Sequence, residues 1–259
     1  MKLILALARA SHFAPTLLVS SVAGAFTAKV WQLNLALPIA LIVLVGQLCI
    51  GWSNDAIDAK NDILQDRREK PVVAQVVTAS TLTRLSIFAA LICLPLNLLG
   101  PLGFKAGALH LLAIGSGISY NFFFKNNVFS PLPFALSFGL LPTFILIAAN
   151  VQPPVWVFLW GALLGVTAHF ANCLKDIDSD LRVGIKGLPQ RVGGKASRII
   201  TIAGVLLSGI VVLAPVGLSV LALINLPFVP ILLRVNLAKF FPALMLIALL
   251  NIFGTIYFF

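Results

Sequence analysis

The acidic residues of this chain fall into two short segments, and their types and spacing suggest chemistry. The protein has 259 residues but only 8 Asp and Glu. The first segment is WSNDAIDAKNDILQDRREKP, residues 52–71, and the second is NCLKDIDSDLRVGIKG, residues 172–187. The acids are Asp55, Asp58, Asp62, Asp66 and Glu69 in the first segment, and Asp176, Asp178 and Asp180 in the second.

The carboxylates of each segment share one face of a predicted helix, because their spacing is i, i+3, i+7 in the first and i, i+4 in the second. The first face carries Asp55, Asp58, Asp62 and, if the helix continues, Asp66; the second carries Asp176, Asp180 and, one turn earlier, Asn172. Two like charges about 4 Å apart repel by roughly 4 kcal/mol at an effective dielectric constant of about 20. Solvated loop acids would balance nearby Lys and Arg without needing to align, so we expect a cation between the carboxylates.

Carboxylates at this spacing suit Mg²⁺, which prefers oxygen ligands and is usually bound through one or two carboxylates together with substrate phosphates. Lys and Arg side chains bind phosphate oxygens directly. The basic residues near the two segments in the predicted topology are Arg67, Arg68, Lys70, Lys125, Lys186 and Arg191. The acidic and basic sets together predict a site for a metal-bridged diphosphate. A nucleotide is not expected, because the sequence has no Walker-type or G-x-G-x-x-G loop.

The elements that must position these side chains are membrane-spanning helices. The chain is 60% hydrophobic and 10% charged, whereas soluble domains carry about 25% charged residues. Its apolar runs have the length of about 20 residues that a spanning helix needs, and they lack the alternation of a β-barrel. We therefore predict an all-α polytopic membrane protein. The expected spans are residues 11–29, 34–58, 72–98, 102–122, 131–150, 154–175, 197–214, 217–233 and 238–258.

The distribution of basic residues predicts how this bundle of about nine helices is oriented. With the amino terminus inside, all Lys and Arg except Lys29, Lys105 and Arg84 lie on the inner side, which is 15 of the 18. The positive-inside rule then places the amino terminus, both acidic segments and the expected active-site cavity at the cytoplasmic face. In a prokaryote the membrane would be the plasma membrane. The net charge of +10 is mainly a topology signal. No nucleic-acid partner is expected, since none of this charge forms a soluble basic face.

The two acidic segments also resemble the motifs of a known family. NDAIDAKND at residues 54–62 resembles the N-D-x-x-D-x-x-x-D signature of the UbiA superfamily of intramembrane prenyltransferases. DIDSD at residues 176–180 resembles the second motif of that superfamily, D-x-x-x-D, and is followed by VGIKG at residues 183–187. The helix count and the placement of both motifs on even-numbered helices extend the resemblance over essentially the whole chain.

The resemblance implies one prenyltransferase domain over residues 1–259, acting in lipid or quinone biosynthesis. Its substrates would be a polyprenyl diphosphate, which ionises with Mg²⁺ to an allylic carbocation, and a small aromatic or other cyclic acceptor. The implied metal ligands are Asp55, Asp58, Asp62, Asp176 and Asp180. The implied diphosphate-binding residues are Asn54, Arg67, Lys70, Lys125, Asn172, Lys186 and Arg191. The implied catalytic residues are Asp55, Asp58, Asp176, Asp180 and Tyr120.

Two further side chains have two interpretations each. Tyr120 ends the fourth predicted span, where its ring could stabilise a carbocation or lie in the aromatic belt at the membrane surface. His169, near the second motif, could deprotonate an acceptor or serve as a hydrogen-bonded packing residue. His12 and His110 have no supporting context in the sequence.

Other functions remain open at this point. An ion- or proton-coupled transporter also carries acids in its membrane segments, although it would be expected to place them near the midplane. An enzyme that cyclises or hydrolyses an isoprenoid diphosphate would need the same two motifs. A non-catalytic scaffold would leave the aligned carboxylates without a purpose. The sequence contains no motif that selects an acceptor or a prenyl chain length.

Overall fold

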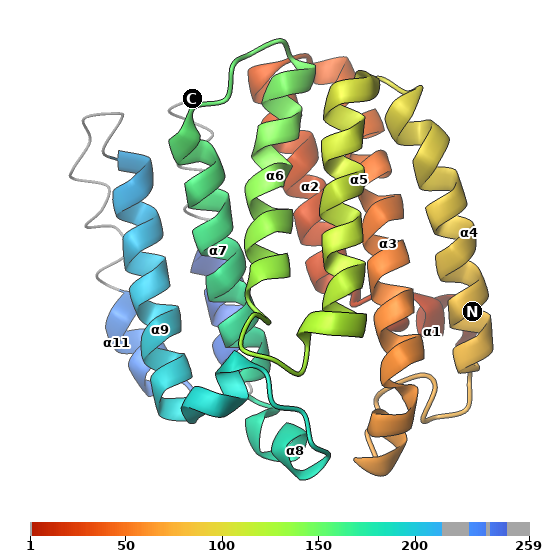
Figure 1. Ribbon diagram of the computed structural model, residues 1–259, viewed down its shortest axis with the longest axis vertical. Coiled ribbons are helices and arrows are strands. Elements are labelled where there is room, and N and C mark those ends of the chain that lie inside the picture. Colours follow the sequence, from red (N-terminus) through yellow and green to blue (C-terminus); the bar gives the residue numbers. More distant parts are fainter. Residues whose placement is uncertain (1, 214–227, 237–238, 248–259) are drawn as a thin grey trace. The chain divides into compact units, whose positions relative to one another are not determined.

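Every regular element that the structure describes is a helix. The computed structural model describes residues 2–213, 228–236 and 239–247 (Figure 1). The chain divides into two compact units, which are considered separately here. The first unit comprises Met1–Phe122 and Phe144–Val151, and the second comprises Phe123–Thr143 and Gln152–Phe259. The predicted all-α class is confirmed for the described residues.

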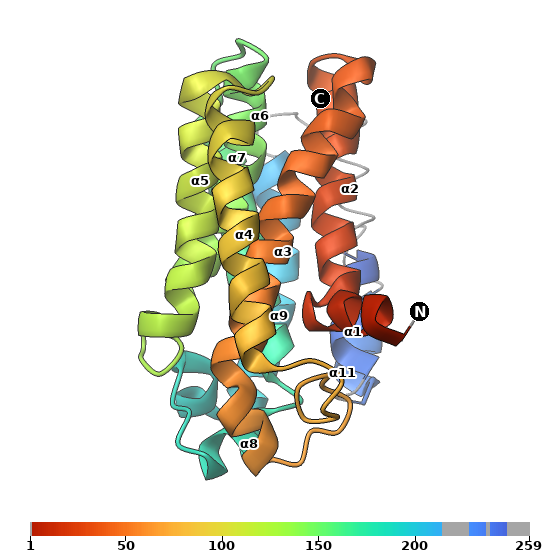
Figure 2. The same cartoon turned by 90° about the vertical axis from the view of Figure 1, so that its right-hand side faces the viewer.

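The first unit is built around one long helix. Its elements are α1 (Lys2–Ala10), α2 (Phe13–Val30), α3 (Leu33–Leu64), α4 (Ala79–Leu98), α5 (Gly103–Ser119) and the beginning of the π-helical turn η1 (Tyr120–Phe124). Helix α3 packs against α2, α4 and α5 and therefore forms the centre of the unit. Figure 2 shows that α1 is short and lies across the end of α2 rather than along it.

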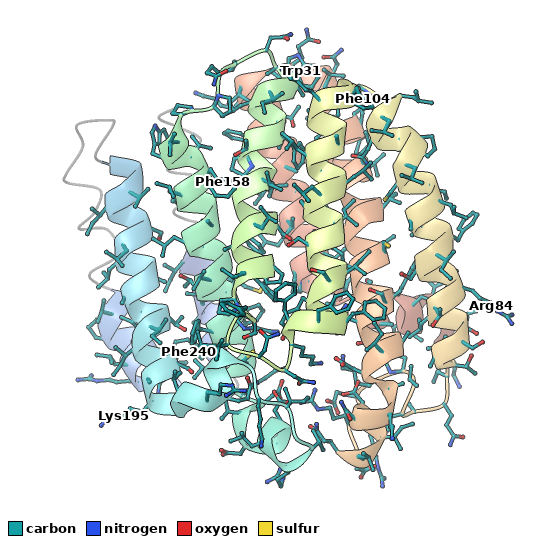
Figure 3. All side chains as sticks on the ribbon, in the orientation of Figure 1. Trp31, Arg84, Phe104, Phe158, Lys195 and Phe240 are labelled. Carbon is teal, nitrogen blue, oxygen red and sulfur yellow. The ribbon has the colours of Figure 1, made fainter. Side chains whose placement is uncertain are left out.

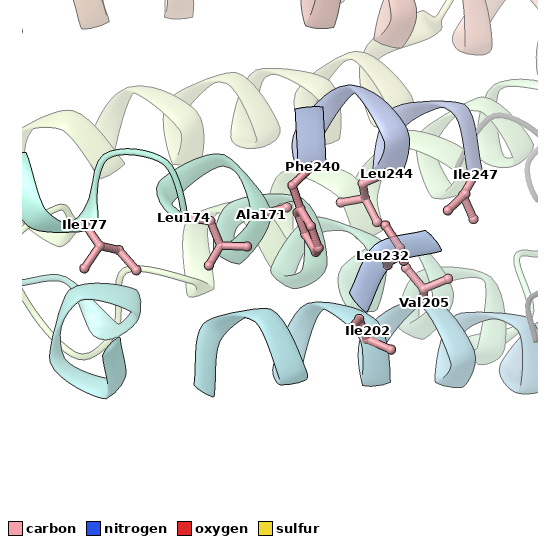
Figure 4. Close-up of a cluster of buried hydrophobic side chains, with 9 residues drawn as sticks. All are labelled: Ala171, Leu174, Ile177, Ile202, Val205, Leu232, Phe240, Leu244 and Ile247. Atoms are coloured by element: carbon pink, nitrogen blue, oxygen red, sulfur yellow. The ribbon is translucent and has the colours of Figure 1, made fainter. Parts of the chain in front are cut away.

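The second unit holds the second acidic segment. Its elements are most of α6 (Leu132–Ala148), then α7 (Val155–Cys173), α8 (Ile177–Arg182), α9 (Leu188–Leu213), α11 (Phe228–Arg234) and a helical segment at residues 239–247. Its apolar core consists of Ala171, Leu174, Ile177, Ile202, Val205, Leu232, Phe240, Leu244 and Ile247 (Figure 4). Because Leu174 and Ile177 belong to this core, the chain on both sides of Asp176 is held by hydrophobic packing.

Helix α9 changes direction near its beginning. Gly193 has φ 82° and ψ 167°, which interrupts the helix between a short first part and the long second part. An L side chain rarely adopts such a positive φ, whereas glycine does so readily. The first part of α9, directly after the second acidic segment, therefore has a direction of its own (Figure 1).

The protein is a multi-pass membrane protein. Six described helices are long and apolar enough to cross a bilayer, and α6 is apolar but shorter. The six are Phe13–Val30, Leu33–Leu64, Ala79–Leu98, Gly103–Phe124, Val155–Cys173 and Leu188–Val211. The spans expected at residues 217–233 and 238–258 lie partly outside the described residues, so the total of nine remains a prediction.

Large apolar side chains point outward from the helices, as Figure 3 shows. Leu37 on α3 is 68% exposed, and Phe88 and Leu91 on α4 are each 61% exposed. Exposed apolar surface on this scale marks an interaction site. On helices long enough to span a bilayer, lipid is the surface that would cover it.

Two predicted helix boundaries were wrong. Residues 72–78, expected within the third span, form turns and bends. Helix α4 begins only after Thr78, whose hydroxyl accepts the backbone N–H of Thr81 at 3.1 Å. Such an N-cap fixes where a helix begins. Arg84 therefore lies on the second turn of α4, where its side chain is exposed near the beginning of the helix (Figure 3). Helix α9 begins at Leu188 instead of residue 197, because Pro189 suits a first helical turn even though the segment is polar.

Candidate active site

Helix α3 is longer than a bilayer requires and carries three aspartates of the first acidic segment, Asp55, Asp58 and Asp62. It has 32 residues and so extends about 48 Å at about 1.5 Å per residue, whereas the hydrocarbon core is about 30 Å thick. Along its last turns Asp55 and Asp62 are buried and Asp58 is partly buried. The helix thus continues through all three aspartates and keeps them on an inward face, as their spacing predicts.

Two side chains, Lys70 and His12, lie close to the same carboxylate oxygen of Asp55. The side chain is 1% exposed. Lys70 Nζ donates to Oδ1 at 2.5 Å, and His12 Nε2 lies 3.3 Å from the same atom. The other oxygen, Oδ2, is buried and has no hydrogen-bond partner among the described residues. A buried carboxylate oxygen is unfavourable without a partner, and a divalent cation would satisfy it.

Asn54, the first residue of the motif, is also held by distant segments. Its Oδ1 lies 3.1 Å from His12 Nε2, and its Nδ2 donates to Asn121 Oδ1 at 2.7 Å. Asn121 is buried in η1, directly after the partly buried Tyr120. Short π-helical turns often occur at functional sites. These hydrogen bonds fix the amide of Asn54 and join α3 to the end of α5.

The acidic face of α3 ends at Asp62. Nη1 of Arg67 lies 3.4 Å from Asp62 Oδ1. Asp66 was expected on this face only if the helix continued, but α3 ends at Leu64 and Asp66 lies in a turn with φ 48°, a conformation that Asp tolerates. Asp66 is exposed and pairs with Arg68 at 3.0 Å. Its hydrogen bond and charge raise the pKa of the Arg68 guanidinium, so the guanidinium stays charged.

The second motif lies on a short helix of its own. The sequence placed it at the end of the sixth span, but α7 ends at Cys173 and α8 begins just after Asp176. The backbone N–H of Asp180 donates to the carbonyl of Asp176 at 2.8 Å, so a helical turn still links the two. Asp180 is 9% exposed and its Oδ2 accepts Gln190 Nε2 at 2.8 Å. Asp176 is partly buried, and Asn172 is exposed on the last turn of α7.

Of the three candidate basic residues in the second unit, Lys125 and Lys186 lie on two loops in contact, and Arg191 lies on the first turn of α9. Lys125 is partly buried, whereas Lys186 and Arg191 are exposed. Arg191 Nε donates to the carbonyl of Lys186 at 2.7 Å, which stabilises the turn between them. A Cβ on Gly187 would lie 2.8 Å from the carbonyl oxygen of Lys125. The backbones that carry Lys125 and Lys186 therefore touch, and only glycine permits that approach.

The donor chemistry fits Mg²⁺. Within the described residues, no three His, Cys, Asp or Glu side chains form a cluster that could hold a metal. Mg²⁺ does not need such a cluster, because it is usually bound by one or two carboxylates, water and substrate phosphates. In the first unit, Oδ2 of Asp55 and the partly buried Asp58 could supply carboxylate oxygens. In the second unit, Asp176 and Asp180 could supply them.

Three partners of the motif residues were not predicted. His12 contacts Asn54 from 42 positions away, and Gln190 contacts Asp180 from 10 positions away in a different helix. No local spacing rule links such pairs. Asn121 had one signal, since it follows Tyr120, which the sequence did single out.

The fold and these side chains define an all-helical integral membrane protein whose carboxylates and basic residues gather near helix ends. A sequence profile of the UbiA prenyltransferase family matches residues 13–255. The chain therefore belongs to the UbiA prenyltransferase family. A search among curated proteins finds no match.

Solved structures share the fold at low sequence identity. A UbiA homologue from Archaeoglobus fulgidus bound to DMAPP and Mg²⁺ has a TM-score of 0.70 and 16% identity, and the match covers 97% of this chain and 99% of that one. An apo UbiA homologue from Aeropyrum pernix K1 has a TM-score of 0.69 and 16% identity, covering 93% and 95%. Digeranylgeranylglyceryl phosphate synthase has a TM-score of 0.67 and 17% identity, covering 99% and 100%. This likeness establishes the fold of a membrane prenyltransferase.

Proposed function

We propose that this protein transfers a prenyl group from a polyprenyl diphosphate to a small cyclic acceptor, with Mg²⁺ and at the cytoplasmic face of the membrane. Both units would act together as one domain over residues 1–259. The observation that carries the proposal is Asp55, a buried carboxylate with Lys70 on one oxygen and no described partner on the other. The structures of A. fulgidus homologues with GPP or DMAPP and Mg²⁺ support the same ligand class.

The metal would be held by carboxylates of both motifs. When bound, Mg²⁺ supplies positive charge where negative charge builds up on the leaving diphosphate. Its ligands would be drawn from Asp55, Asp58, Asp62, Asp176 and Asp180. Asn54, fixed by His12 and Asn121, would orient the first motif, and Asn172 would do so for the second.

Basic side chains would bind the diphosphate oxygens directly. Lys70 lies 2.5 Å from Asp55 and Arg67 lies 3.4 Å from Asp62. A diphosphate bridged to these carboxylates would therefore have both cations within reach. Lys125, Lys186 and Arg191 would supply the corresponding charges from the second unit.

The reaction then needs little covalent chemistry from the protein. The C1–O bond of the prenyl diphosphate breaks, and the diphosphate leaves with the electron pair. The acceptor forms a bond to C1 and loses a proton. Tyr120, partly buried beside Asn121, would present its ring to the allylic cation. The surrounding apolar helices would exclude water, which otherwise captures that cation.

The test is turnover of radiolabelled geranyl or dimethylallyl diphosphate by protein in lipid nanodiscs, with a panel of aromatic and other cyclic acceptors. We expect activity with Mg²⁺ and none with EDTA. Asp55→Asn and Asp176→Asn should each lower kcat by about 10²–10³, as expected for loss of one preorganised charge-stabilising group. Asp66→Asn, an exposed acid of the same segment, is the matched control and should keep wild-type activity.

Product analysis separates the alternatives. A prenylated acceptor supports transfer. If every acceptor tested gives only a prenyl alcohol, the protein is a hydrolase, and if every acceptor gives only a cyclic hydrocarbon, it is a cyclase. Solute flux in proteoliposomes without any prenyl product would indicate a transporter. Wild-type turnover by Asp55→Asn or Asp176→Asn would contradict the assigned site.

A further inference from the structure

A buried serine joins three segments of the second unit. Ser130 is fully buried in the connection before α6. Its Oγ accepts the backbone N–H of Leu188 at 2.9 Å and lies 3.0 Å from His169 Nε2. Since the hydroxyl accepts from Leu188, its own proton can be donated to the imidazole. One side chain thus connects the loop after η1, the helix α7 and the beginning of α9.

Both ring nitrogens of His169 have neighbours within the second unit. It is 1% exposed, and its ring packs on Phe134 with the centroids 4.6 Å apart. Nε2 faces Ser130, and Nδ1 lies 4.0 Å from Cys173 Sγ. A base that deprotonates an acceptor needs a nitrogen that reaches the substrate. The contacts favour the packing interpretation of His169 over the catalytic one.

The segment held by Ser130 carries residues of the proposed site. Leu188 follows Lys186 and Gly187, and a Cβ on Gly187 would lie 3.1 Å from Ser130 Oγ. Gln190, on the first turn of the same helix, is 6% exposed and donates to Asp180 at 2.8 Å. The position of Lys186 relative to Asp180 therefore depends on buried hydrogen bonds and not on the exposed loop alone.

We propose that Ser130, His169 and Gln190 are positioning residues that hold Asp180, Lys125 and Lys186 in one fixed arrangement before substrate binds. This inference rests on the proposed function. None of the three positioning side chains touches the diphosphate; each acts through another residue. We call the hydrogen bonds of Ser130, His169 and Gln190 the brace. A displacement of about 1 Å at a reacting group can slow a reaction by about 10²-fold, so loss of the brace should affect both KM and kcat.

Activity tests the brace with matched variants. Ser130→Ala should raise the KM for geranyl diphosphate and lower kcat, together reducing kcat/KM by at least about tenfold. Ser208→Ala is the control, because Ser208 is equally buried in the second unit and its hydroxyl bonds to Val205 within its own helix; it should stay within about twofold.

Substitution of His169 separates positioning from proton transfer. The amide end of Gln lies at about the same reach as Nε2, so His169→Gln should keep the bond to Ser130 and most of the activity, whereas His169→Leu should behave like Ser130→Ala. A His169→Gln protein as inactive as His169→Leu would overturn the positioning role.

Limited proteolysis gives a readout that needs no catalysis. Trypsin cleaves after Lys186 once the loop opens, and we expect cleavage there to be at least about tenfold faster in Ser130→Ala than in wild type or Ser208→Ala. If Ser130→Ala is cleaved faster but the wild-type protein turns over no prenyl diphosphate, the proposed function is contradicted and the structural role of the brace is supported. Unchanged cleavage and kinetics would overturn the brace. If Ser130→Ala does not accumulate, Gln190→Met, which removes the donor to Asp180, makes the same test.

Discussion

Lys70→Met is expected to destabilise the protein substantially in the absence of metal. Lys70 Nζ lies 2.5 Å from Asp55 Oδ1, and the side chains are 17% and 1% exposed. Removing one partner of a buried ion pair costs roughly 3–5 kcal/mol, because the other charge stays buried. Lys70 is partly exposed and His12 remains beside Asp55, so the lower end, about 3 kcal/mol, applies.

A neighbouring surface pair provides the control. Arg68 and Asp66 pair at 3.0 Å in the same segment, but their side chains are 83% and 69% exposed. Solvent and salt screen such exposed ion pairs, so they contribute little to stability, and Arg68→Met should have little effect. Adding Asp55→Asn to Lys70→Met removes the uncompensated charge, and this double variant should recover most of the lost stability.

The assay is thermal unfolding of purified protein in detergent with EDTA. At roughly 2–4 °C per kcal/mol for a chain of this size, Lys70→Met should lower the apparent Tm by about 6–12 °C. Arg68→Met should leave the Tm close to that of wild type. A Lys70→Met protein that melts with wild type would refute the reasoning. A double variant with Lys70→Met and Asp55→Asn that melts no higher than Lys70→Met would also refute it, because the lost stability would then not come from an unpaired carboxylate.

Three further variants have expected outcomes that can be measured by kinetics or by the yield of folded protein. His12→Ala should lower kcat/KM by about tenfold, because Asp55 and Asn54 both lose a partner; wild-type kinetics would contradict this. Gly107→Ala should lower the yield of folded protein severely, because its Cβ would overlap the carbonyl oxygen of Asn97. Gly115→Ala, on the same helix with open space around it, should be neutral or stabilising by up to about 1 kcal/mol, and equal yields of the two would contradict the packing.

The sequence predicted those parts of the site that depend on local periodicity. The i, i+3, i+7 spacing of Asp55, Asp58 and Asp62 placed them on one helical face, and α3 does continue through all three. The apolar runs predicted a helical membrane protein because the bilayer imposes length and composition on each span separately. Both inferences need only neighbours in the chain.

What the sequence did not predict depends on tertiary contacts or on backbone turns. His12 was dismissed, yet it contacts two motif residues through a turn in which its own φ is 55°. The sequence left open whether the helix reaches Asp66, and the helix in fact ends two residues before it. The sequence predicted no site role for Ser130 or Gln190, because serine and glutamine are common residues. Only their burial and hydrogen-bond partners indicate a role.

The central claim is that carboxylates of both units bind one metal ion together with the diphosphate. The direct measurement is the distance from bound Mn²⁺ to a nitroxide label, by pulsed electron paramagnetic resonance with dimethylallyl diphosphate present. One label is placed at Lys60→Cys on α3 and, in a separate protein, one at Asp178→Cys on α8; both sites are exposed, whereas the three native cysteines are buried. We expect Mn²⁺ within about two helix diameters, roughly 20–24 Å, of each label. If the distance from Mn²⁺ lies in that range for one label and is much longer for the other, the claim is contradicted.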